Sequence, residues 1–312
     1  MAVPGHRGSV MSSAVGQAPA LLRYRAFLGA VFAPGVHVTY GVLWVCAYEA
    51  AAVMTAGGVW RPSVGSLVRA MTIIVVLLHL RLADERMDES YDRIHNPDRP
   101  LITGLVSVLE LRRAGWVTAA LAIVVNIPLA PWSAVAVALL VGYTELVTRL
   151  TLHSPRLRDR ALLYIVVAYP VQLLIGVYLY TSVTGAEVVQ PGIRPALLII
   201  VFAAAFLHFE FARKTVRDPD PGGRTYSATV LGVTGSGVLT LGWALLACAL
   251  LAAITEPWHM SVPAHLPYVA LVFPVAGAFS YLSGREQTWP ASLAMLYLIV
   301  LDAALVISGW LG

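Results

Sequence analysis

The chain has few charged residues for its length. Asp, Glu, Lys and Arg make up only 12% of its 312 residues, whereas a soluble globular protein carries roughly 25%. Hydrophobic residues make up 58% of the sequence, and the mean hydropathy is +0.76. A soluble fold needs a charged surface, so the apolar surplus must face lipid. The composition excludes a soluble domain built around one core and predicts an integral membrane protein.

Cysteine and lysine are also scarce. Cys46 and Cys248 are the two cysteines, and both lie in apolar runs. Two such residues build neither a disulfide framework nor a cysteine metal site, so we interpret them as small buried hydrophobes. The 21 Lys and Arg residues exceed the 17 Asp and Glu residues only slightly, which by itself predicts no nucleic-acid partner. Lys214 is the single lysine.

Long apolar segments replace any strand pattern, because alternation at period two is absent. A helix crosses a bilayer with about 20 apolar residues. We therefore predict an all-α polytopic membrane protein, with a flexible segment over residues 1–20 and a single transmembrane domain over residues 21–312. Residues 21–32 are expected to form an amphipathic surface helix. Nine segments are predicted to span the membrane: 34–56, 64–83, 104–127, 132–151, 161–182, 194–212, 229–254, 266–283 and 291–311.

The basic residues predict the orientation of these spans, because cytoplasmic loops are enriched in Lys and Arg. Placing the N-terminus and the joins after spans 2, 4, 6 and 8 on one side gives that side eighteen of the 21 basic residues. The other side receives Arg61, Arg69 and Arg194. We therefore expect a cytoplasmic N-terminus in a multi-pass protein of the plasma membrane. Most of the acids lie on the same cytoplasmic side.

The first group of acids follows the second predicted span and comprises Asp84, Glu85, Asp88 and Asp92. Spacings of three and four residues place such side chains along one helical face, one turn apart. Stacked carboxylates repel one another, and a divalent cation offsets that repulsion. Mg²⁺ binds one or two carboxylates together with phosphate oxygens and water. The alternative is a solvated acidic helix end whose partners are Arg81, Arg86 and Arg93.

A proline-rich turn follows this group. Pro97 and Pro100 flank Asp98 and Arg99, and Gly104 opens the next predicted span. The two prolines restrict the backbone around Arg99. A rigid turn that aims a guanidinium at a row of acids suits a metal–diphosphate site. The alternative is an ordinary proline-rich loop.

With these residues the sequence resembles the UbiA superfamily of intramembrane prenyltransferases. The first motif of that family, Asn-Asp-x-x-Asp-x-x-x-Asp, corresponds here to Asp84, Glu85, Asp88 and Asp92. Its Arg-Pro-Leu-x-x-Gly turn corresponds to the segment from Arg99 to Gly104. Asp84 stands where the family has Asn and Glu85 where it has Asp, and both replacements keep an oxygen ligand. The resemblance covers nearly the whole chain and implies a cavity on the cytoplasmic side.

The family has a second acid row, Asp-x-x-x-Asp with a further acid one turn on, after its sixth span. Glu210 and Asp218 match the outer positions, but Lys214 occupies the middle one. Lys214 and Arg213 either bind the diphosphate directly and replace part of a metal's charge, or the site has lost one metal. An interfacial lysine that extends its ammonium toward water is a third interpretation.

The resemblance implies the roles of the site residues and an Mg²⁺ cofactor. Of these residues we expect Asp88, Asp92, Glu210 and Lys214 to act in catalysis. The diphosphate is assigned to Arg99, Arg149, Arg213 and Lys214, although the spacing around Arg149 matches the family poorly. The expected metal ligands are Asp84, Glu85, Asp88, Asp92, Glu210 and Asp218.

Three functions remain open from the sequence. The first is ionisation of a prenyl diphosphate and alkylation of an aromatic or quinoid acceptor. The second is a membrane terpene cyclase, in which the cation closes on its own double bonds. The third is a transporter or assembly protein, against which the near absence of charge in the opposite loops argues. Aromatic side chains at Tyr40, Trp44, Tyr164, Tyr169 and Tyr178 are candidates for an isoprenoid pocket, with belt anchoring or packing as the alternative.

Overall fold

A computed structural model describes residues 19–154, 156–157, 160–218 and 231–312. The predicted flexible segment, up to residue 18, lies outside the described residues. The described residues form helices joined by turns and loops, and they contain no strand apart from one isolated bridge between Val216 and Thr288. The helices are α2 (Ala20–Val31), α3 (Pro34–Thr55), α4 (Val64–Met87), α5 (Glu89–His95), α6 (Val108–Val124), α7 (Pro131–His153), α9 (Ala161–Ala168), α10 (Pro170–Gly185), α11 (Ile193–Ala212), α12 (Gly232–Thr255), η2 (Pro257–His259), η3 (Val262–His265), α13 (Leu266–Val269), α14 (Val272–Leu282) and α15 (Ala291–Leu311).

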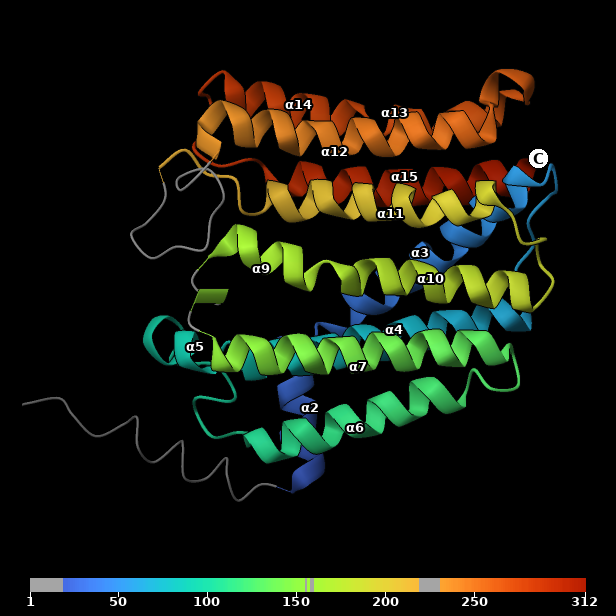
Figure 1. Cartoon of the computed structure of the whole chain (residues 1–312). Helices are drawn as coiled ribbons and strands as arrows, with labels where there is room; N and C mark the ends of the chain where they lie inside the picture. Colours follow the sequence, from blue (N-terminus) through green and yellow to red (C-terminus); the bar gives the residue numbers. More distant parts are fainter. Residues whose placement is uncertain (1–18, 155, 158–159, 219–230) are drawn as a thin grey trace, which may run out of the picture.

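The long helices lie side by side in a bundle (Figure 1). Eight helical segments of the described chain are long and apolar enough to cross a membrane, which confirms the all-α membrane fold. The predicted span 104–127 forms only α6, a helix of 17 residues that is shorter than those eight. The predicted count of nine spans and the side of the membrane on which each loop lies therefore stay predictions.

Proline and capping side chains set several helix limits. Pro34 and Pro131 stand in the first turn of α3 and α7, where a missing backbone N–H is tolerated. Ser107 and Glu110 form a capping box that starts α6 after the proline-rich turn. The predicted span 161–182 is divided between α9 and α10, because Pro170 has no N–H to continue the helix.

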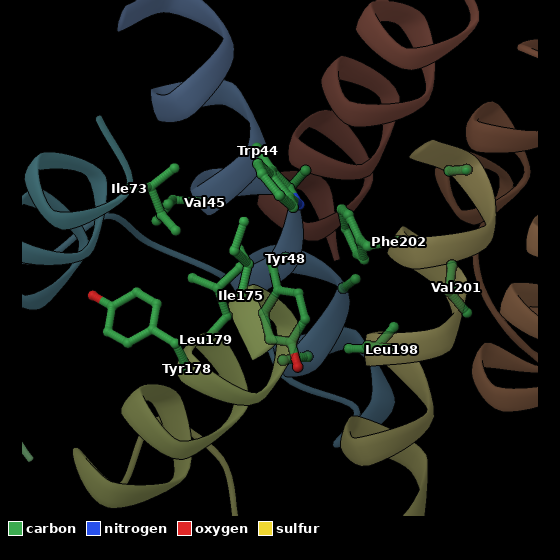
Figure 2. Packing of buried hydrophobic residues seen from close by; sticks show 14 of the residues in the cluster. Trp44, Val45, Tyr48, Ile73, Ile175, Tyr178, Leu179, Leu198, Val201 and Phe202 are labelled. Atoms are coloured by element: carbon green, nitrogen blue, oxygen red, sulfur yellow. The ribbon is translucent and has the colours of Figure 1, made fainter. Parts of the chain in front are cut away.

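The main core cluster takes buried side chains from α3, α4, α6, α7, α10, α11, α12 and α15. Figure 2 shows Trp44 and Tyr48 of α3 packed among side chains of α10 and α11, which include Ile175 and Phe202. The rings of Tyr48 and Phe202 lie 5.3 Å apart. This packing fixes α3 against the two helices and so positions the residues at their ends.

One buried ion pair joins α3 to α4. Arg69 lies within the predicted span 64–83 and is fully buried in α4, where its guanidinium lies 2.7 Å from Glu49 of α3. Trp60 and Ser66 donate hydrogen bonds to the other Glu49 oxygen, and Arg69 donates to Ser182 of α10. A charge inside a membrane protein needs such partners. The network ties α3, α4 and α10 together.

The predicted helix over residues 21–32 is confirmed as α2, which begins at Ala20 and ends at Val31. Its buried residues Phe27 and Val31 pack against Leu82 of α4 and Leu111 of α6. The Arg81 guanidinium donates to the Val31 carbonyl at 2.9 Å. These contacts place α2 next to the acidic end of α4.

Candidate functional site

The first acid group stays on a nearly continuous helix. Asp88 separates α4 from α5, yet its N–H donates to the Asp84 carbonyl at 2.9 Å, and the N–H of Asp92 donates to the Asp88 carbonyl at 2.8 Å. These i to i+4 bonds keep Asp84, Asp88 and Asp92 one turn apart, as the spacing predicts. The C-terminal ends of α4 and α11 lie at the same end of the bundle, to the left in Figure 1.

The acids of this group face two directions. Asp84 lines a pocket, whereas Glu85 and Asp92 lie on the neighbouring face and contact Arg99. Glu85 and Asp92 are seven residues apart, so they share a face, and Asp84 is turned about 100° from Glu85. Asp88 lies between the two faces, close enough for its charge to act on both Asp84 and Glu85.

The turn after α5 does bring Arg99 to the acids. Its guanidinium lies 3.3 Å from Glu85 Oε1 and 3.9 Å from Asp92 Oδ2. Gly104 has a φ of 77°, a left-handed conformation that favours glycine. Arg99 does not line the pocket, so its predicted contact with a diphosphate stays a prediction.

The neighbouring arginines match the helix-end alternative only in part. Arg81 pairs with Glu85 at 2.6 Å and Arg93 with Glu89 at 2.8 Å, each one turn apart. Arg86 instead reaches across to Glu145 of α7, at 2.8 Å. Glu145 therefore pairs with an arginine of another helix and not with Arg149, the partner one turn along α7 that its spacing suggests.

The second acid group is dominated by cations. Arg213 donates two hydrogen bonds to Glu210, at 2.6 and 2.9 Å, and the Lys214 ammonium lies 2.6 Å from Glu210 Oε1. Burial lowers the pKa of Lys214, the Glu210 and Asp84 carboxylates oppose this, and Arg213 adds to it. Lys214 is thus a largely buried cation that pairs with Glu210 of α11 and lies within electrostatic reach of Asp84 of α4.

A pocket of about 230 Å³ joins the two acid groups. Asp84 of α4 and Glu210 of α11 both line it, together with Arg213, at the end of the bundle where these helices end. The rest of the wall is mainly apolar and aromatic. It consists of Trp44, Leu77, Leu80, Ala83, Met87, Thr144, Val147, Tyr164, Ile165, Ala168, Tyr169, Val171, Gln172, Ile175 and Phe206.

The pocket places three of the five predicted aromatic residues, Trp44, Tyr164 and Tyr169, in its wall. The Tyr169 hydroxyl donates to the Ala203 carbonyl, which fixes the ring between α9 and α11. Sequence reasoning missed Phe206 and Gln172, which carry no motif. Their only signal is position, because Phe206 lies one helical turn before Glu210 on α11.

Other predicted site residues lie outside the pocket. Arg149 is exposed on α7, and Asp218 is exposed after the end of α11. Glu85 and Asp92 are buried, but they face Arg99. In the family that the sequence resembles, a Gly-containing turn and a Thr follow the second acid row. The corresponding residues here, Gly222 to Thr225, lie outside the described residues.

The side chains at the first acid group fit a magnesium ion better than those at the second. No group of three or more His, Cys, Asp or Glu is arranged to hold a metal in the described part of the chain. Mg²⁺ that is shared with phosphate needs only one or two carboxylates. Asp84 lines the pocket and has no hydrogen bond or ion pair within the described residues, so its oxygens are available. Glu210 is already held by two cations.

A model of the UbiA prenyltransferase family matches residues 42–301. A structure described for digeranylgeranylglyceryl phosphate synthase in membranes superposes with a TM-score of 0.65 at 12% identity, over 93% of this chain and 99% of the other. The apo structure of a UbiA homolog from Aeropyrum pernix K1 gives 0.61 at 15% identity, over 86% and 96%. No curated protein matches the sequence.

Proposed function

Because this chain belongs to the UbiA prenyltransferase family and is a multi-pass integral membrane protein, we propose that its pocket ionises an allylic prenyl diphosphate and transfers the prenyl group to an aromatic or quinoid acceptor. The observation that carries the proposal is the shared pocket of Asp84 and Glu210. Two acidic helix ends meet there beside a largely apolar wall. Such a pocket matches a substrate with one charged end and one hydrocarbon end.

The charged end of the pocket suits the diphosphate. Arg213 lines it, and Lys214 lies beside Glu210 within electrostatic reach of Asp84. Guanidinium and ammonium groups form charge-assisted hydrogen bonds with phosphate oxygens. These bonds strengthen as negative charge builds on the departing diphosphate, so they favour the breaking of the allylic C–O bond.

The carboxylates of α4 are the proposed magnesium ligands. Asp84 and Asp88 would hold Mg²⁺, and Glu85 and Asp92, which contact Arg99, would help to hold it directly or through water. Bound magnesium supplies positive charge that stabilises the leaving diphosphate. Glu210 and Asp218 are the weaker candidates, because Glu210 is paired with cations and Asp218 is exposed.

The apolar end suits the isoprenoid. Trp44, Tyr169 and Phe206 present aromatic rings to the pocket, and the face of such a ring attracts a cation. The lipid-embedded wall keeps water away from the allylic cation, which water would otherwise quench. The cation can then react with an acceptor.

A second candidate function is a terpene cyclase of the same family. The observation that favours it is Lys214, which pairs with Glu210 where acceptor-using relatives have a third acid. A cyclase would use the same ionisation step. In that case the cation closes on its own double bonds and releases a cyclic hydrocarbon.

One assay distinguishes these functions. Membranes that contain the protein are incubated with Mg²⁺ and farnesyl or geranylgeranyl diphosphate, first alone and then with a phenolic or quinoid acceptor. The proposal predicts diphosphate release and a prenylated product only with the acceptor. A cyclic hydrocarbon without acceptor identifies a cyclase. No diphosphate release in either arm, with the protein intact, contradicts both functions and favours a transporter.

The pocket is proposed to lie on the cytoplasmic side of the plasma membrane, with the N-terminus on the same side. Exposed arginines gather at that end of the bundle, among them Arg93, Arg112, Arg149 and Arg160. The positive-inside rule places such an end in the cytoplasm.

A further inference from the structure

The second acid group differs from a metal site because its Glu210 carboxylate is already paired with positively charged side chains. In an acid row that binds a cation, the carboxylate oxygens point at the metal. Here both Glu210 oxygens point at protein cations: Oε2 lies 2.6 Å from Arg213 Nε, and Oε1 lies 2.6 Å from Lys214 Nζ. A metal bound at Glu210 would have to displace these partners and would stand beside two like charges.

The spacing of the residues along the chain keeps these two cations next to Glu210. Arg213 and Lys214 follow Glu210 by three and four residues, which are the spacings at which helical side chains meet. The Glu210 and Lys214 side chains are only 14% and 17% exposed, so water screens their attraction less than at an open surface. The remaining candidate ligand of this group, Asp218, is exposed and does not line the pocket.

We propose that the second acid group holds a fixed ammonium and a fixed guanidinium in place of a divalent cation, so that Lys214 and Arg213 bind one end of the diphosphate without metal. Divalent metal is then taken up only at the first acid group, beside Asp84. This inference rests on the proposed prenyl diphosphate substrate. The diphosphate exchanges with Glu210 for the two cations, and no covalent change in the protein is involved.

Counting bound metal tests the proposal. The full-length protein in detergent is loaded with the unreactive geranylgeranyl S-thiolodiphosphate, and Mn²⁺ is titrated while the free ion is followed by electron paramagnetic resonance. The wild-type protein should take up one Mn²⁺. Lys214→Asp, which supplies a carboxylate where the cation stood, should take up two, and the second should broaden the signal of the first. Arg113→Asp, the same change of charge at an exposed position of α6, should remain at one.

Each other outcome has a clear meaning. Two Mn²⁺ ions in the wild-type protein would overturn the proposal, as would a single ion in a folded Lys214→Asp variant. Failure of the analogue to bind at all, in a protein that remains monodisperse, would instead contradict the proposed prenyl diphosphate substrate.

Binding of inorganic pyrophosphate in EDTA keeps the test decisive if Lys214→Asp does not fold. Lys214→Gln should weaken this metal-free binding by at least about tenfold, because it removes a charge-assisted hydrogen bond. Glu210→Gln should strengthen it, because the two cations lose their competing partner. Unchanged binding in Lys214→Gln, or weaker binding in Glu210→Gln, would contradict the proposal.

Discussion

Asp84, in the last turn of α4, and Glu210, in the last turn of α11, line the same pocket although they come from distant parts of the sequence. They differ in their partners. Asp84 has no ion pair within the described residues, whereas Glu210 is held by Arg213 and Lys214. The pocket therefore has one carboxylate open to a metal and one engaged by cations.

Replacing Asp84 by Leu should reduce catalysis far more than it reduces stability. Leucine is close in size to aspartate but removes both oxygens that could hold a metal, and loss of one preorganised electrostatic group costs about 10²- to 10³-fold in rate. Asp84→Asn, which keeps one oxygen and restores the residue of the family motif, should lose much less. Diphosphate release from the prenyl diphosphate measures both. Glu89→Leu, the same change at an acid of α5 that pairs with Arg93, should have little effect. Equal rates in the Asp84→Leu variant and the wild-type protein would refute the role of Asp84.

The aromatic wall gives a second prediction. Phe206→Leu keeps an apolar side chain in the pocket but removes the π face, so the rate of ionisation should fall by about 2- to 30-fold, the range that corresponds to cation–π energies of roughly 0.5–2 kcal/mol. Phe273→Leu is the matched control, because Phe273 also packs against the core and does not line the pocket. Single-turnover diphosphate release measures both. An equal loss in the two variants would indicate a general packing effect.

Stability should depend on the buried pair of Glu49 and Arg69. Glu49→Gln leaves the Arg69 charge uncompensated inside the bundle, and breaking such a pair costs about 3–5 kcal/mol. Arg194→Ala breaks the pair with Glu256, whose side chains are 48% and 41% exposed, and should cost at most about 1 kcal/mol. Thermal unfolding in detergent, followed by loss of the monodisperse peak, ranks the two. A smaller effect for Glu49→Gln than for Arg194→Ala would show that the network is not structural.

The sequence predicts the helices well because long apolar runs have one stable form in a bilayer. The predicted span 291–311 coincides with α15 (Ala291–Leu311), and the span 34–56 differs from α3 by one residue. Polar side chains set the remaining limits. α4 continues beyond the predicted span to Met87, as the helical spacing of the acids predicts, and Arg81 and Arg86 find acidic partners there. α6 begins only at Val108, where the capping box of Ser107 starts it.

The candidate site is predictable only in part. Motif spacing singled out Asp84 and Glu210, and both line the pocket. Asp84 and Glu85 are neighbours in the motif, and their side chains point about 100° apart on a helix. Motif spacing does not say which of the two faces the pocket, so it did not show that Glu85 points toward Arg99. It also could not foresee the pairing of Arg86 with Glu145, since contacts between helices depend on their packing.

The proposed orientation is tested by labelling single cysteines in intact cells. Ile94 of α5 is 76% exposed at the pocket end of the bundle, and Val262 of η3 is 83% exposed at the opposite end. A membrane-impermeant maleimide should label Val262→Cys but not Ile94→Cys, and a permeant reagent should label both. The unsubstituted chain controls for Cys46 and Cys248. The reverse pattern would place the pocket outside the cytoplasm.

An experimental structure with geranylgeranyl S-thiolodiphosphate and Mg²⁺ would test the central claim most directly. The diphosphate should lie between Asp84 and Lys214, with the prenyl chain along Trp44, Tyr169 and Phe206. A diphosphate bound elsewhere, for example beside Arg194 at the other end of α11, would contradict the account.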